Sequence, residues 1–207
     1  LTMMLVADVS GSKQFGTQAQ FKNEFVTEIA ATLAFSATQN NDKIGLILFS
    51  SEVELFIPPK KGRSHVLRII RELLEFKPKN RETDISEALR FLSSVMKKKA
   101  IVFVLSDFLS ADYKQNLKIM AGKHDVTGIR VFDKSEVEIP KLGVVQMIDQ
   151  ETGKSHLVNT NLKRVRNNYA KYQRDRIHYY EDSFKKSGAG FLSCGTNESY
   201  VKKLLGY

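Results

Sequence analysis

Five oxygen-bearing side chains are the strongest candidates for chemistry in this sequence. Asp8, Ser10 and Ser12 alternate directly after an apolar run, and Asp107 follows a second apolar run. Alternate residues of an extended segment project to the same side, so a carboxylate and two hydroxyls converge there. Thr83 precedes a helix start and adds a further hydroxyl. Oxygen ligands without a nearby Cys or His suit a hard cation such as Mg²⁺ or Ca²⁺.

The elements around these residues indicate an α/β fold. Short apolar runs typical of buried strands occur at residues 2–8, 44–49, 101–105, 125–132 and 191–194. Helical periodicity separates most of them, which favours right-handed crossovers and a doubly wound, mostly parallel sheet. Residues 53–57 follow a tight turn and are expected to form one antiparallel edge strand that ends at Pro58 and Pro59. Ligands of such sheets bind beyond the carboxyl ends of the strands, where Asp8 and Asp107 stand.

Helix signals locate the remaining elements. Asp84 and Glu87 have the spacing of a capping box, which predicts a helix that starts directly after Thr83. In the helix expected at 64–74, the spacing of the apolar residues assigns Leu67, Ile70 and Leu74 to the buried side. The other expected helices cover 17–39, 85–98, 111–122, 161–186 and 197–205, and a polar hairpin joins 143–148 to 156–158.

Length and composition favour one globular domain. The chain has 207 residues, of which 42% are hydrophobic and 27% charged, and we expect a single domain over 1–207 with a hairpin insertion at about 137–160. Because a core strand starts almost at residue 1, an N-terminal segment of the full-length protein is expected to be absent. Cys194 is the one cysteine, which fits a reducing compartment, and we expect a cytoplasmic location. No run approaches the ~18 apolar residues of a membrane span.

The five candidate residues, Asp8, Ser10, Ser12, Thr83 and Asp107, resemble the metal-ion-dependent adhesion site of von Willebrand factor A (vWA) domains. The likeness extends over essentially the whole chain to one uncharacterised bacterial branch, which is encoded beside MoxR-type AAA+ ATPases. The segments that carry it are VADVSGSKQFGT, KIGLILFSSEVELFIPPKKGR, ETDISEAL, VFVLSDF, KHDVTGIRVFD, LGVVQMIDQETGK and RDRIHYY.

This resemblance implies a non-enzymatic interaction module that binds Mg²⁺, with Mn²⁺ or Ca²⁺ as alternatives. The three hydroxyls would ligate the ion, and the two carboxylates would contact it directly or through water. An acidic residue of a partner protein, a MoxR-type AAA+ ATPase or its client, would complete the coordination. Two residues depart from the pattern of many relatives, because Lys13 replaces Met and Glu82 replaces Gly.

Other interpretations of the same residues stay open at this stage. The Ser10–Ser12 segment could be a plain turn, and the strand-end acids could serve a metal-dependent hydrolase. The net charge of +9 also allows a basic module for nucleic acid or an anionic surface. However, the tyrosines of the basic helix 161–186 are more typical of packing than of base stacking. The glycine-rich motifs of nucleotide-binding loops do not occur.

Overall fold

A six-stranded sheet forms the centre of the molecule. The computed structural model describes residues 1–10, 16–133, 136, 139–148 and 155–206. The strand order is β3-β2-β1-β4-β5-β8, and all neighbouring pairs are parallel except β2 and β3. This arrangement confirms the doubly wound, mostly parallel α/β fold with one antiparallel edge strand. The strands are β1 (Thr2–Asp8), β2 (Lys43–Phe49), β3 (Val53–Lys60), β4 (Ile101–Ser106), β5 (Asp125–Phe132) and β8 (Gly190–Gly195).

The edge strand β3 is longer than the sequence predicted. It continues through Pro58 and Pro59 to Lys60, so the prediction that the two prolines end this strand was wrong. Because β3 pairs only with β2 in the sheet, a proline there needs no N–H donor on the open side. The register with β2 shifts between Ile44 and Leu46, which marks an irregularity opposite the prolines.

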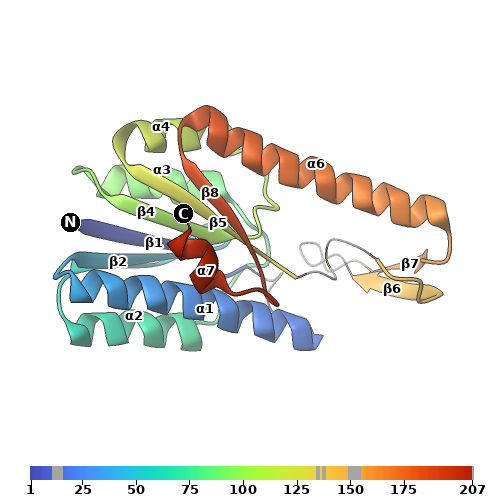
Figure 1. Cartoon of the computed structure of the whole chain (residues 1–207), viewed down its shortest axis with the longest axis horizontal. Helices are drawn as coiled ribbons and strands as arrows, with labels where there is room; N and C mark the ends of the chain where they lie inside the picture. Colours follow the sequence, from blue (N-terminus) through green and yellow to red (C-terminus); the bar gives the residue numbers. More distant parts are fainter. Residues whose placement is uncertain (11–15, 134–135, 137–138, 149–154, 207) are drawn as a thin grey trace.

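Helices cover both faces of the sheet (Figure 1). The helices α1 and α2 lie on one face, together with the short α7, whose Tyr200 ring contacts Phe25 of α1 edge-on at 5.5 Å. The helices α3, α4 and α6 lie on the other face. Their bounds are α1 (Gly16–Gln39), α2 (Arg63–Glu75), α3 (Ile85–Val95), α4 (Lys114–Lys123), α6 (Lys163–Ser187) and α7 (Tyr200–Leu205).

The hydrophobic core therefore has two layers. Met4 and Val6 of β1 join the layer under α3, α4 and α6, whereas Leu5 and Ala7 join the layer under α1 and α2. This alternation follows from the period of two in a strand, because successive side chains point to opposite faces. A strand that is buried on both faces consequently appears in the sequence as one continuous apolar run.

The helix α2 is rotated relative to the sequence prediction. Leu67 and Leu74 are 49% and 64% exposed, whereas Val66 and Ile69 are fully buried against the α1 layer. Both pairs have spacings that place their members near one another on a helix, so the apolar pattern alone allowed either face. The prediction was therefore wrong for Leu67 and Leu74, whereas Ile70, the third residue of that side, is half-buried and packs against the same layer.

A separate two-stranded sheet lies beyond the main body. Its strands β6 (Val144–Ile148) and β7 (Ser155–Asn159) pair antiparallel, as the sequence predicted. In Figure 1 this hairpin lies next to the start of α6, where the helix extends past the carboxyl ends of the parallel strands. The remaining part of the expected hairpin, residues 149–154, falls outside the described residues.

Candidate metal site at the carboxyl edge of the sheet

Asp8 ends β1 and is 1% exposed. Its Oδ1 accepts a hydrogen bond from the Ser10 backbone N–H at 2.9 Å, and its Oδ2 accepts one from Ser106 Oγ at 2.6 Å. A buried carboxylate needs such partners, since desolvation without them is costly. The two donors therefore hold the Asp8 carboxylate in one orientation at the carboxyl edge.

Two hydroxyls from distant parts of the chain meet beside this carboxylate. Thr83 Oγ1 donates to Ser10 Oγ across 2.7 Å. Neighbouring oxygens of an octahedral Mg²⁺ site, with bonds of ~2.0–2.1 Å, lie about 2.9 Å apart. The observed spacing of the two oxygens thus fits adjacent ligands of a small hard cation.

The start of α3 holds Thr83 in place. Asp84 is the N-cap, and its Oδ1 accepts the Glu87 backbone N–H at 3.0 Å, which is the first half of the predicted capping box. The reciprocal half is not formed, because the Glu87 carboxylate pairs with Arg90 instead. The Asp84 backbone N–H donates to the Ser50 carbonyl at 2.8 Å, and Ser110 Oγ donates to the Thr83 carbonyl at 3.1 Å. These bonds tie Thr83 to the turn after β2 and to the segment after β4.

Asp107 directly follows β4 and is 3% exposed. Its Oδ1 accepts the Leu109 backbone N–H at 3.1 Å, and its Oδ2 accepts from Lys22 Nζ at 3.2 Å. The next residue, Phe108, has a left-handed backbone with φ of 59°, which is unusual for an aromatic residue. The Phe108 N–H donates to Ser106 Oγ at 3.1 Å, so the serine that donates to Asp8 also fixes the backbone that follows Asp107.

Lys22 of α1 is a buried cation beside this site. It is 1% exposed, and its Nζ lies 3.2 Å from Asp107 Oδ2 and 3.1 Å from both carboxylate oxygens of Glu136. Burial alone lowers the pKa of Lys22, but the two carboxylates outweigh it, so the pKa is raised and the ammonium stays charged. A second cation, Arg130 of β5, is 6% exposed, and Asp107 and Glu136 oppose the lowering of its pKa by burial.

The structure therefore brings Asp8, Ser10 and Thr83 together, and the Asp107 carboxylate is held by the Leu109 N–H and Lys22 Nζ. Ser12 and Lys13 lie outside the described residues. Glu82 has an exposed side chain. In the described part of the chain, no three His, Cys, Asp or Glu side chains cluster as metal ligands. A metal at this edge would accordingly depend on hydroxyl oxygens as well as carboxylates.

Sequence reasoning missed Ser106 and Lys22. Ser106 precedes Asp107 in the motif VFVLSDF, and a serine between a buried strand and an acid was a usable signal. Lys22 had no such signal, because its partners are 85 and 114 positions away in the chain. A lysine in an amphipathic helix is normally expected on the solvent side.

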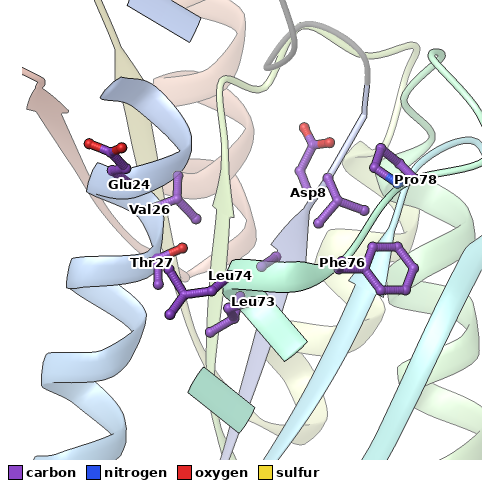
Figure 2. A pocket seen from close by; sticks show the side chains of 10 residues that line it. Asp8, Glu24, Val26, Thr27, Leu73, Leu74, Phe76 and Pro78 are labelled. Atoms are coloured by element: carbon purple, nitrogen blue, oxygen red, sulfur yellow. The ribbon is translucent and has the colours of Figure 1, made fainter. Parts of the chain in front are cut away.

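A cavity of about 260 Å³ opens beside Asp8. Figure 2 shows Glu24 and Thr27 of α1 on one side of it, and Phe76 and Pro78 on the other side, near Asp8. Typical small-molecule pockets measure roughly 300–1,000 Å³. The cavity is therefore small for an enclosed substrate, and its lining combines apolar side chains with two carboxylates.

Two of the four histidines lie at the edge of the sheet opposite Ser10. His65 Nε2 bonds the Ile44 carbonyl at the amino end of β2, and His124 immediately precedes β5. Both thus lie at the amino edge, opposite Ser10. His156 lies on the hairpin and His178 is exposed on α6. A Ser–His nucleophile needs hydrogen-bond contact between the two side chains, and the amino-edge positions of His65 and His124 do not allow it.

Three of the four tyrosines of α6 hold this helix to the body of the molecule. Tyr180 is fully buried, and its hydroxyl lies 2.9 Å from both the Gly128 and the Leu192 carbonyl oxygens, which share its single donor proton. Tyr169 donates to the Glu136 carbonyl at 2.7 Å, and Tyr179 bonds Asp112. These contacts agree with the packing interpretation rather than with base stacking.

The sheet order and the helices on both faces define a vWA-like α/β fold. BatB of Bacteroides thetaiotaomicron and an aerotolerance-related membrane protein of Bacteroides fragilis each match with a TM-score of 0.63 at 14% identity. The first match covers 99% of this chain and 95% of that chain, the second 100% and 96%. The SpRpn10 VWA domain matches with a TM-score of 0.50 at 9% identity, over 99% of this chain and 93% of that chain. Such low identities show the fold alone.

The family follows from the sequence. The model of the family described as "Protein of unknown function DUF58" matches residues 1–179, so the chain belongs to that family. Uncharacterised proteins of Mycobacterium tuberculosis and Mycobacterium bovis are 27% identical to it over 156 residues, or 74% of this chain. The match covers 49% of those proteins, so this chain spans about half of their length.

Within the described part of the chain, no helix has the length and apolar character that crossing a membrane requires.

Proposed function

We propose that this chain is a non-enzymatic protein-interaction module that binds Mg²⁺, with Mn²⁺ or Ca²⁺ as alternatives, at the carboxyl edge of its sheet. The contact between Ser10 Oγ and Thr83 Oγ1, at 2.7 Å beside the oriented Asp8 carboxylate, carries this proposal. Asp8, Ser10 and Thr83 would hold the ion, with Ser12 and Asp107 as the remaining candidates. The bound ion would supply a positive charge, and a carboxylate of another protein could then ligate the ion.

The charges near the site support an acidic partner. The buried cation Lys22 contacts Asp107 and Glu136, whereas Asp8 and Glu24 line the neighbouring cavity and form no ion pair with any described residue. A divalent ion would add two positive charges to this carboxylate-rich edge. Without the ion, the same edge repels an incoming carboxylate.

A MoxR-type AAA+ ATPase, or a client of it, is the partner that we propose. The support is the likeness of the sequence to the vWA branch that is encoded beside such ATPases. A role in the assembly, maturation or stress response of proteins would follow from that partnership, and the chain would work in the cytoplasm. The small cavity beside Asp8, and the positions of His65 and His124 at the edge opposite Ser10, support recognition over hydrolysis.

Thermal unfolding and calorimetric titration with MgCl₂ and MnCl₂ test the metal site. An ion present at 100 times its Kd stabilises the folded state by about 2.7 kcal/mol, which for a chain of this size raises Tm by roughly 5–11 °C. We expect Asp8→Ala and Thr83→Ala to fold and to lose this shift. Asp125→Ala removes an exposed carboxylate at the opposite edge and should keep it. A wild-type protein that takes up neither ion would overturn the proposal.

The partner is tested with the same variants. Immobilised wild-type protein should retain the MoxR-type ATPase in Mg²⁺ and release it in EDTA, and Asp8→Ala should not retain it. Retention that survives EDTA would contradict metal-dependent recognition. Metal-dependent turnover of phosphoesters that Asp8→Ala abolishes would instead favour the hydrolase.

A further inference from the structure

The buried Lys22 joins three separate parts of the molecule. It lies on α1, Asp107 follows β4, and Glu136 follows β5. Its Nζ contacts the first carboxylate at 3.2 Å and both oxygens of the second at 3.1 Å. The side chains of Lys22 and Asp107 are 2% and 3% exposed, while that of Glu136 is 34% exposed.

The buried ion pair between Lys22 and Asp107 affects the charge that a metal ion would meet. A buried ammonium is costly unless carboxylates surround it, and removing one partner of a buried pair leaves an uncompensated charge. Asp107 thus has its negative charge balanced from within the protein. A divalent ion at the Asp8, Ser10 and Thr83 oxygens would meet an Asp107 that is already engaged by a cation.

We propose that Lys22 is an internal counter-ion that competes with the divalent ion for Asp107 and thereby sets the metal affinity of the site. This inference rests on the proposed function. Glu136 is the second anchor of the ammonium, and it holds Lys22 when Asp107 turns to the metal. Metal binding is consequently coupled to α1 and to the segment that follows β5.

Titration of the whole chain with Mn²⁺ alone, followed by calorimetry and by the EPR signal of the free ion, tests this competition. Lys22→Met removes the charge and keeps a long apolar side chain, so Mn²⁺ should bind about tenfold tighter. Glu136→Gln leaves Lys22 to Asp107 alone and should weaken Mn²⁺ binding about threefold. Lys118→Met, at an exposed lysine of α4, is the matched control and should bind as the wild type does.

Stability provides an independent readout. Without metal, Lys22→Met should unfold at lower temperature than the wild type, because Asp107 loses its counter-ion. Saturating Mn²⁺ should then raise its Tm by more than it raises the wild-type Tm, since the ion replaces the lost charge.

The outcomes separate the two proposals. A wild-type chain that binds neither Mn²⁺ nor Mg²⁺ overturns the proposed function. A wild-type chain that binds Mn²⁺, beside a folded Lys22→Met variant of equal or weaker affinity, overturns the counter-ion role alone. If Lys22→Met does not fold, Glu136→Gln decides, and an affinity equal to or above that of the wild type contradicts the inference.

Discussion

At the residue scale, the buried His124 lies at the amino edge of the sheet, away from the candidate metal site. His124 is 4% exposed, and its Nδ1 accepts the Ala100 backbone N–H at 3.2 Å. Among the described residues its Nε2 has no hydrogen-bond partner. Burial, and then the neighbouring Lys123, lower the pKa of His124. The folded state therefore favours the neutral ring, whose unprotonated Nδ1 is the acceptor.

We expect stability to fall as the pH decreases through the ordinary histidine pKa of about 6.5, because the unfolded chain takes up a proton there and folded His124 does not. The loss continues until the pH reaches the lowered folded pKa. Urea unfolding between pH 8 and pH 5 measures this slope, and His124→Asn, which keeps an acceptor, should flatten it. His178→Asn, on the exposed face of α6, should not. Parallel profiles for the wild type and His124→Asn would contradict the assignment.

At the level of elements, the first turn of α3 connects helix stability to the site. Asp84 caps the helix through the Glu87 N–H, while the preceding Thr83 provides the hydroxyl that contacts Ser10. The cap fixes the direction in which the chain enters the helix. Fraying of this turn would therefore move Thr83 away from Ser10.

Asp84→Ala should cost about 1 kcal/mol of stability, the usual value for a lost N-cap, and lower Tm by about 2–4 °C. It should also weaken metal binding, because Thr83 loses its fixed position. Asp84→Asn retains the cap acceptor and should behave nearly as the wild type. Denaturant unfolding and Mn²⁺ titration measure both effects. An Asp84→Ala chain with lower stability but unchanged affinity would show that the cap does not position Thr83.

At the scale of the whole molecule, an aromatic cluster links the site edge to α6. Phe108, next to Asp107, has its ring centroid 4.5 Å from that of Tyr180 and 5.3 Å from that of Phe184. A Cβ at Gly128 of β5 would lie 2.5 Å from the Phe184 ring. The absence of a side chain at Gly128 thus allows α6 to approach the sheet and to support Phe108.

A double-mutant cycle tests this close approach. Gly128→Ala should destabilise the wild type by about 1–3 kcal/mol through overpacking, and Phe184→Ala by about 3–5 kcal/mol through the cavity that it leaves. The double variant should be more stable than the sum predicts, because Phe184→Ala provides the space that the added methyl group needs. Unfolding free energies of the four proteins in guanidinium measure the coupling. Additive losses would mean that the Phe184 ring does not restrict the space for a side chain at position 128.

The order of the elements and most of the sheet were predictable from local patterns. The bounds of β1, β2 and β5 lie within one residue of the predicted ranges, because continuous apolar runs between turns have few other interpretations. The face of α2 and the end of β3 were not predictable. They depend on which neighbour packs against the helix, and on Pro58 and Pro59 lying in an edge strand rather than in the middle of the sheet.

For the site, the alternation of Asp8 and Ser10 and the strand-end position of Asp107 indicated a common edge in advance. The local sequence predicted the helix start after Thr83, but the contact between the Thr83 hydroxyl and Ser10 also depends on the strand order, which local sequence does not contain. The supporting Ser106 and the cation Lys22 became visible only in three dimensions. Local spacing specifies which side chains can ligate an ion, but the charge that surrounds them depends on contacts between residues up to 114 positions apart, and folding alone brings those together.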